Sequence, residues 1–361
     1  MLGGTINPFI NRLRGILAMG VVCWHVLGMP GQIPFSTDIW QGVFGPLVLF
    51  SGFNYVVGFI VVSGYCIARS TLKRDFTFAR YMALRITRIY PALIACACIA
   101  GIVELVLFES PHRLAVWNSG ITVHNFGLSL IGLSGFYGQF GSYAATYTVS
   151  YELLFYVIWG AVFAATPTTI AVPTSAIVGA GLYFVLPMNY HFALVLFGAW
   201  LIGAALAVYE KEIIRVARHV PLWLMWLVVI WAYVTWNGLT GPLGGLMWSA
   251  PACLSYLPLG LLFAIVMACH LARNGPALQL DDWLGDISYP LFLVHIPIVM
   301  ATGSAIKASG VTLSYFAIMA VYFASSILVA QGVLVLVERP VMRMRYGISI
   351  RPANLSAHPA E

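Results

Sequence analysis

Charged side chains are scarce in this sequence: Asp, Glu, Lys and Arg together make up 8% of its 361 residues. About a quarter of the residues in a soluble domain are charged, so the composition excludes an ordinary soluble protein. Hydrophobic residues make up 61%, and the mean hydropathy is +0.90. The 18 basic residues outnumber the 12 acidic ones. In so apolar a chain this excess indicates membrane topology rather than nucleic-acid binding.

The motifs of several common enzyme classes are also missing. The chain has no Walker-type phosphate loop, no G-x-S-x-G motif and no H-E-x-x-H motif. Its 6 cysteines lie in apolar runs without the spacing of metal ligands, and we interpret them as packing residues. These absences argue against covalent serine hydrolysis and against a metal site.

Long apolar segments dominate what remains. A helix needs ~20 residues to cross the hydrocarbon of a bilayer, and the sequence predicts an all-α, polytopic bundle of about ten such spans. We place them at residues 10–29, 44–69, 86–108, 147–166, 170–187, 192–209, 221–238, 251–272, 284–303 and 313–337. The first run lacks an A-x-A cleavage site, so we keep it as a span. We expect one membrane domain over 1–345 and a short, disordered cytoplasmic tail over 346–361.

The placement of the basic residues predicts the orientation of this bundle. With the N-terminus in the cytoplasm, only two of the 18 basic residues, Arg113 and Lys307, fall outside. Cytoplasmic segments are enriched in Lys and Arg, so both termini are predicted to be cytoplasmic. The long outside segment 109–146 contains an apolar stretch at 126–136. That stretch fits either a re-entrant segment or a short surface helix.

The first predicted span carries two ionisable residues, Arg14 and His25, eleven positions apart. At ~1.5 Å and ~100° per residue they lie roughly 16 Å apart on one helix face. An ionisable residue inside a span is a functional-site hypothesis by default. A neutral imidazole near the outer surface can act as a general base. The alternative is an Arg that sets topology and a His that is hydrogen-bonded inside the bundle, and this pair alone leaves both open.

A second basic motif, Arg85-Ile-Thr-Arg88-Ile-Tyr90-Pro91, opens the third predicted span. Arg85 and Arg88 share a helix face because they are three positions apart. Guanidinium groups suit phosphate, so the motif favours an anionic ligand. The alternative is topogenic charge alone.

Acidic and imidazole groups also occur inside or at the ends of later spans. Glu152, two residues after Ser150, enters the fourth span from outside, where it can orient an imidazole or hold a proton. In the ninth span we expect Pro290 and Pro297 to bend or open the helix. We favour a structural role for His295 in that span. Glu338-Arg339-Pro340 is predicted to end the last helix with an internal ion pair.

Taken in order, these motifs resemble the acyltransferase-3 family of integral membrane O-acyltransferases. The resemblance runs from about residue 9 to 345. It is carried by Leu13-Arg14-Gly15 with His25, Phe59-Ile-Val-Val-Ser63-Gly64-Tyr65, Arg85-Ile-Thr-Arg88-Ile-Tyr90-Pro91, Ser150-Tyr-Glu152 and Leu284-Gly-Asp286-Ile-Ser288-Tyr289-Pro290-Leu-Phe-Leu-Val-His295. The chain departs from the family pattern near Tyr147, where a Trp often precedes the Ser-x-Glu motif. The resemblance implies a stand-alone form without an appended soluble domain.

The resemblance implies roles for particular residues. It gives Arg14 and His25 the roles of the R-x10-H pair, and Arg85 and Arg88 the handling of acyl-CoA. Our hypothesis adds that His25 is the catalytic base with Glu152 as its orienting carboxylate, and that Arg14 and Tyr90 also contact the acyl-CoA. A covalent acyl-histidine intermediate is the alternative that the sequence leaves open. We expect the acceptor to be contacted by side chains of the outer loop and the adjacent span, namely Tyr137, Gln139, Tyr143 and Ser150.

The predicted function is transfer of an acyl group, acetyl first of all, from cytoplasmic acyl-CoA to an extracytoplasmic hydroxyl. The acceptor is expected to be a glycan or a lipid-linked sugar, and the location a bacterial inner membrane. Acyl-CoA serves as the donor substrate, and we predict no bound cofactor and no nucleic-acid partner. The main alternative is a proton-coupled transporter that uses His25, Glu104, Glu152 and His295, although no pattern of paired broken helices supports it. A non-enzymatic scaffold would leave Arg14 and His25 unexplained.

Overall fold

The computed structural model describes residues 7–28, 52–72, 76–113, 120–229, 250–273 and 275–349. Throughout these ranges the regular elements are helices. Seven of the described helical segments are long and apolar enough to cross a membrane. The prediction of an all-helical, multi-pass membrane protein is therefore confirmed. The count of ten spans and the orientation stay predictions.

The long helices follow the predicted spans closely. In chain order they are α1 (Pro8–Gly28), α4 (Gly52–Thr71), α5 (Phe78–Leu107), α8 (Tyr147–Ala165), α9 (Thr168–Val185), α10 (Met188–Val208), α13 (Ala250–Leu271), α14 (Asp281–Ser309) and α15 (Tyr315–Val333). The predicted span 221–238 is helical over 222–229, and its remainder lies outside the described residues, as does the start of span 44–69.

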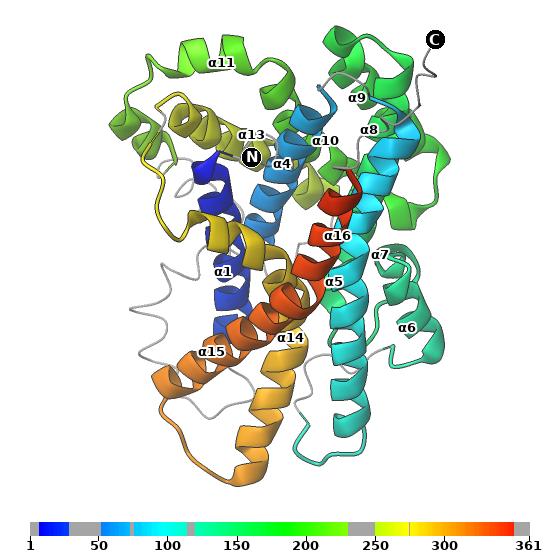
Figure 1. Ribbon diagram of the computed structural model, residues 1–361, viewed down its shortest axis with the longest axis vertical. Helices are drawn as coiled ribbons and strands as arrows, with labels where there is room; N and C mark the ends of the chain where they lie inside the picture. The colour runs from blue at the N-terminus through cyan, green and yellow to red at the C-terminus, as the bar shows by residue number, and fades with distance from the viewer. Residues whose placement is uncertain are drawn as a thin grey trace, which may run out of the picture.

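Short elements connect or extend the long ones. They are α6 (Val123–Leu130), α7 (Ser134–Tyr137), η4 (Ala144–Thr146), α11 (Glu210–Ala217), η6 (Leu334–Glu338) and α16 (Arg339–Ser349). The apolar stretch 126–136 thus forms parts of two short helices, α6 and α7, joined by a turn. Helix α6 lies beside the lower half of α5 in Figure 1, and α7 packs against α6 and α8.

Local sequence signals set where several helices begin. The Thr77 side chain accepts a hydrogen bond from the backbone N–H of Arg80 (3.4 Å), so α5 begins at Phe78 rather than near residue 86. Thr122 caps α6 in the same way through the N–H of Asn125 (3.1 Å). As a result Arg85 and Arg88 both lie on α5, within its first three turns.

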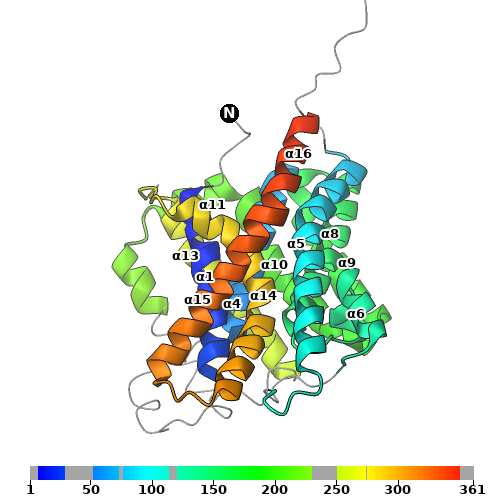
Figure 2. The same ribbon diagram turned by 60° about the horizontal axis from the view of Figure 1, so that its bottom comes forward.

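The helices pack as a bundle around α4 and α14. Helix α1 lies against both of them, α4 also lies against α10, and α14 contacts α5 and α15. In Figures 1 and 2, α1, α4, α5 and α14 run side by side, and α15 crosses in front of α14 at an angle. The beginning of α1, α11 and the end of α16 all lie at the same end of the bundle, the upper end in both views.

Glycines allow close contacts in two pairs of helices, α1 with α14 and α4 with α10. A Cβ atom built on Gly15 of α1 would lie 2.5 Å from Cβ of Leu284 in α14, and one on Gly285 would lie 2.6 Å from Oδ1 of Asn11. Between α4 and α10, a Cβ on Gly64 would lie 2.0 Å from the carbonyl oxygen of Trp200. These backbones approach each other more closely than any side chain permits.

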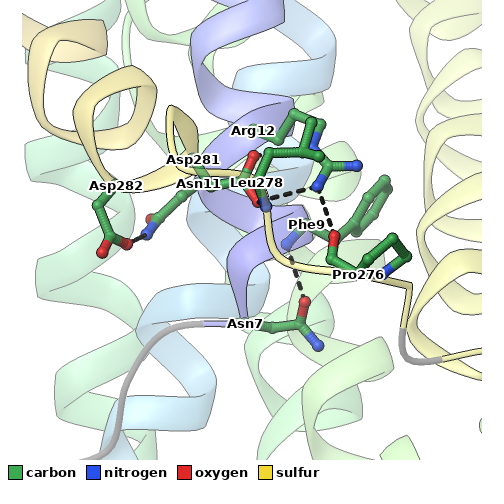
Figure 3. Close-up of polar contacts among 8 residues, drawn as sticks. All are labelled: Asn7, Phe9, Asn11, Arg12, Pro276, Leu278, Asp281 and Asp282. Atoms are coloured by element: carbon green, nitrogen blue, oxygen red, sulfur yellow. Dashed lines mark hydrogen bonds and ion pairs between the residues drawn. The ribbon is translucent and has the colours of Figure 1, made fainter.

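Polar contacts fix the upper end of α1 to the start of α14 (Figure 3). The Arg12 guanidinium donates to both carboxylate oxygens of Asp281, each at 2.8 Å, and to the carbonyl of Pro276 at 2.8 Å. Nearby, Asn11 donates to Asp282 (3.1 Å). Because Asp281 is almost fully buried and is held in the bidentate geometry that Arg favours, this pair sets the register between the two helices.

Two expectations about the course of the helices were wrong, one at the end of the last helix and one inside α14. The last helix does not end at Glu338-Arg339-Pro340, since the π-helical turn η6 continues directly into α16, which runs to Ser349. A π-turn is wider than an α-turn and leaves room for the proline ring, which would otherwise clash with a preceding carbonyl. Of the two effects expected of Pro290 and Pro297, local opening of the helix is wrong, because α14 is one continuous helix through both residues.

Candidate active site

A large cavity of about 1280 Å³ lies among α1, α4, α5, α8, α10, α11 and α14. Its lining includes seven cationic side chains, namely Arg14, Arg69, Arg85, Arg88, Lys211, Arg215 and Arg218. Among the described residues, three acidic side chains face it, Glu152, Glu210 and Glu212. The cavity therefore brings together four residues that the sequence singled out, in surroundings that favour an anionic ligand.

Arg14 and Arg85 have unused hydrogen-bonding capacity at this cavity. Among the described residues, Arg14 forms no hydrogen bond or ion pair. Arg85 donates to Ser70 Oγ at 3.4 Å, but its buried Nε has no partner within the described part of the chain. A guanidinium that is enclosed without an acidic partner is costly unless a ligand supplies the negative charge.

Arg88 differs from Arg85 although both belong to the same motif. It forms an ion pair with Glu338 of η6, whose side chain is only 3% exposed. The guanidinium also lies over the ring of Tyr289, 5.9 Å from its centroid. The π-helical turn η6 thus supplies the carboxylate that neutralises Arg88. The predicted internal pair of Glu338 with Arg339 does not form, because Arg339 instead lies 3.9 Å from Asp286.

Glu152 lies on the cavity wall rather than at the imidazole that we expected it to orient. Its carboxylate accepts a hydrogen bond from Tyr156 (2.8 Å), whose hydroxyl is also 3.2 Å from Ser63 Oγ. The positive charges of Arg14 and Arg85 act on it. Glu152 is therefore part of the charged lining of the cavity.

Among the described residues, His295 is the side chain that contacts a ring nitrogen of His25. His25 Nδ1 lies 3.2 Å from His295 Nε2 and 2.9 Å from the carbonyl oxygen of Val21. His295 is completely buried, and its Nδ1 lies 2.7 Å from the carbonyl oxygen of Phe292. Phe292 lines the cavity, and its ring centroid lies 6.1 Å from that of His295. This residue connects the cavity to the pair of histidines.

Three other predicted site residues make internal contacts away from the cavity lining. The Tyr90 hydroxyl donates to the carbonyl of Ile131 (2.9 Å). Tyr143 is fully buried and donates to the carbonyl of Leu93 (2.8 Å), which leaves it no surface for an external acceptor. Ser150 is also buried, and its Oγ accepts from the backbone N–H of Gly135 (2.9 Å). All three tie the segment 131–150 to α5 and α8.

The remaining two predicted acceptor residues lie at the end of α7 and just after it. Tyr137 is 54% exposed, and its hydroxyl is 2.6 Å from that of Tyr190. The backbone carbonyl of Gln139 accepts a hydrogen bond from the Asn125 side chain (3.0 Å), which helps to order this segment. Of the four loop and span residues predicted to touch the acceptor, Tyr137 presents the most accessible side chain.

Sequence analysis missed three features of this site. His295 was assigned a structural role because its contact with His25 joins residues 270 positions apart. Arg69 was not assigned to a site, and the basic residues of α11 were counted only as cytoplasmic charge. The available signal for α11 was its amphipathic pattern, in which Lys211 and Arg215 are four positions apart and so share one helix face.

Fold and site together define a multi-pass membrane protein with a cationic cavity and a pair of histidines in contact between α1 and α14. A family model described as an acyltransferase domain, that of acyltransferase 3, matches residues 7–335. The chain therefore belongs to the acyltransferase-3 family and is a membrane acyltransferase. No curated protein and no solved structure matches it.

Proposed function

We propose that the enzyme takes an acyl group, acetyl in the first instance, from cytoplasmic acyl-CoA. It transfers the group to a hydroxyl of a glycan or lipid-linked sugar on the other side of a bacterial inner membrane. The single observation that carries this proposal is the cavity, where seven cations face three carboxylates at the end of the bundle where α1 begins. A polyanionic donor with a long flexible arm suits such a cavity.

The donor proposal assigns different parts of acyl-CoA to different parts of the cavity. The exposed rim residues Lys211, Arg215 and Arg218 face the nucleotide, while Arg85 and Arg14 face its diphosphate and the start of the pantetheine arm. Guanidinium groups bind phosphate oxygens through charge-assisted hydrogen bonds. The apolar lining by Phe59 and Phe292 suits the arm and the acyl group.

His25 is the proposed general base, and its surroundings support this role. A carbonyl oxygen only accepts hydrogen bonds, so the short contact with Val21 places a proton on Nδ1 of His25. In the neutral ring, Nε2 is then the basic nitrogen. The acceptor O–H attacks the thioester carbonyl, its proton passes to Nε2, and the C–S bond breaks to release the CoA thiolate, which is then protonated.

The length of α1 supports transfer from one side of the membrane to the other. Arg14 lines the cavity, and His25 lies roughly 16 Å further along the same helix by the ~1.5 Å rise per residue. An extended pantetheine arm is of comparable length. With α1 beginning in the cytoplasm, the acyl group would reach His25 near the outer surface, where exposed aromatic groups such as Tyr137 suit a sugar acceptor.

The test compares wild type with His25→Ala in sealed liposomes supplied with labelled acetyl-CoA on the cytoplasmic face and candidate glycans on the other. Loss of a general base costs ~10²–10⁴-fold, so we expect His25→Ala to lose acyl transfer to that extent. Both proteins should bind CoA equally well and unfold at similar temperatures. His191→Ala is the matched control, since His191 stacks on Tyr183 away from the cavity lining.

Two results would contradict the proposal. Wild-type turnover by a folded His25→Ala protein would remove His25 from the chemistry. Movement of a labelled solute into the liposomes without any acyl transfer would instead favour the proton-coupled transporter.

A further inference from the structure

The contact between His25 and His295 fixes how the protons are distributed over both rings. His295 Nδ1 lies 2.7 Å from the carbonyl oxygen of Phe292, so this nitrogen carries a proton. In the neutral ring, His295 Nε2 then has a lone pair. That lone pair faces Nδ1 of His25 at 3.2 Å, and this Nδ1 also carries its proton, because Val21 offers only an acceptor. The Nδ1–H of His25 is therefore shared between a carbonyl oxygen and His295 Nε2.

We propose that His295 is a positioning residue for acyl transfer, holding the His25 ring by accepting its Nδ1–H so that Nε2 faces the acceptor hydroxyl. The inference rests on the proposed role of His25 as general base. When Nε2 takes the proton, the Nδ1–H of the imidazolium keeps two acceptors, the Val21 carbonyl and His295 Nε2. A carboxylate performs this task in hydrolytic triads. Here a neutral imidazole does so, without placing a second charge in the membrane.

The surrounding helices hold His295 for this purpose. Its helix, α14, is pressed against α1 by the Gly15 and Gly285 contacts and is tied to it by Arg12 and Asp281. His295 is fully buried, and its second ring nitrogen is occupied by the Phe292 carbonyl. The ring of Phe292 packs against that of Phe59 (5.6 Å between centroids) and closes the side toward the cavity. His295 consequently has one free acceptor nitrogen, and it faces His25.

The first arm of the test measures protonation directly and does not depend on activity. In wild-type protein labelled with ¹⁵N-histidine, magic-angle-spinning NMR should show His25 protonated at Nδ1 and unprotonated at Nε2. His295 should show the same tautomer. The His25→Gln and His295→Gln variants assign the signals, since the chain has 8 histidines. A His25 ring that carries its proton on Nε2 overturns the inference, whatever the enzyme transfers.

The second arm measures acyl transfer. His295→Leu removes the acceptor and should lower kcat about tenfold, as expected for loss of one hydrogen bond, while KM for the donor stays within about twofold. His295→Gln retains an acceptor oxygen and should recover part of that loss. His270→Gln is the matched control, because His270 is a helical histidine bonded to its own Val266 carbonyl (2.9 Å) and stacked on Phe9.

The outcomes of the two arms are distinguishable. An unchanged kcat in His295→Leu overturns the positioning role while leaving His25 as the base. Equal losses in His295→Leu and His295→Gln also overturn it, because a purely spatial role would then suffice. If the wild type transfers no acyl group at all, the proposed function fails, and the NMR arm still tests the hydrogen bond.

Discussion

Arg85 and Arg88 belong to one short motif but have different surroundings. The difference suits Arg85 to ligand binding and Arg88 to stabilising the fold. Arg85 has no acidic partner among the described residues and leaves a buried Nε without a hydrogen bond. Arg88 neutralises Glu338, a carboxylate that is 3% exposed. From the sequence alone we expected the same role for Arg85 and Arg88, because both occupy the same face of α5.

We expect substitution of Arg85 to weaken donor binding and substitution of Arg88 to destabilise the fold. In Arg85→Gln, loss of a charge-assisted phosphate contact costs about 1.5–3 kcal/mol of donor affinity. In Arg88→Gln, Glu338 is left as an unpaired buried charge, which costs about 3 kcal/mol of stability. Calorimetric titration with CoA and thermal unfolding in detergent measure the two effects.

A double substitution provides the control for Arg88. Arg88→Gln combined with Glu338→Gln removes both charges, so we expect it to regain most of the stability lost in the single variant. If the single Arg88→Gln protein were as stable as wild type and bound CoA poorly, the assignment of Arg88 to the fold would be wrong.

At the scale of elements, close helix contacts position the residues of the cavity. Ser63 and Tyr65 lie on α4 on either side of Gly64, and all three belong to one predicted motif. The backbones of α4 and α10 meet here, since a Cβ on Gly203 would lie 1.9 Å from the carbonyl oxygen of Val61. Both helices contribute residues to the cavity, so their separation determines its width.

Gly203→Ala should therefore destabilise the bundle. The added methyl group has no space beside a backbone carbonyl, and overpacking of this kind costs about 1–3 kcal/mol. Gly332→Ala is the matched control: it lies inside α15 with no neighbouring atom within 4 Å of a Cβ, and there Ala should be neutral or stabilising. Thermal unfolding of the purified variants measures both effects. Equal stability of Gly203→Ala and wild type would show that α4 and α10 separate easily.

Features of the fold and site that depend on neighbouring residues could be predicted from the sequence. Features that depend on contacts between distant helices could not. Hydropathy is local, so the apolar runs gave helices such as α8 and α9 within a few residues. The resemblance to family motifs assigned Arg14 and Arg85 to one ligand, and both line the cavity, but it did not anticipate Glu152 in the same lining. The pairing of His25 with His295 depends on the packing of α1 against α14, which no local periodicity specifies. The same holds for Glu338, whose direction depends on a π-turn that α-helical spacing does not anticipate.

At the scale of the whole molecule, the distribution of charge is strongly one-sided. Arg12, Arg69, Arg85 and the basic residues of α11 all lie at the end where α1 begins and α4 ends. This asymmetry agrees with the predicted cytoplasmic location of that end. Membrane orientation requires only that positive charges lie on the cytoplasmic side. The cations at the rim of the cavity also face a common space, which orientation does not require. The two glutamates of this rim cancel only part of this charge, because Glu210 pairs with Arg69 at 3.2 Å and Glu212 is outnumbered by Lys211, Arg215 and Arg218.

The rim residues should recognise the part of the donor that remains outermost, which is the nucleotide with its 3′-phosphate. In Arg215→Gln combined with Arg218→Gln we expect CoA affinity to fall about tenfold, the value of one charge-assisted phosphate contact at an exposed rim. Wild type should bind 3′-dephospho-CoA about as weakly as the double variant binds CoA. The variant should hardly distinguish the two ligands. Its affinity should also depend less on salt, because exposed charges are screened.

Arg343→Gln controls for general loss of positive charge, because Arg343 is an exposed cation of α16 that does not line the cavity. It should bind both ligands as wild type does. Equal wild-type affinity for CoA and dephospho-CoA would show that the nucleotide phosphate is not bound at this rim. The donor would then enter the cavity in another orientation, with Arg14 and Arg85 as its main cationic contacts. Since these two arginines lie on α1 and α5 rather than on α11, Arg85→Gln would then remain the more damaging substitution.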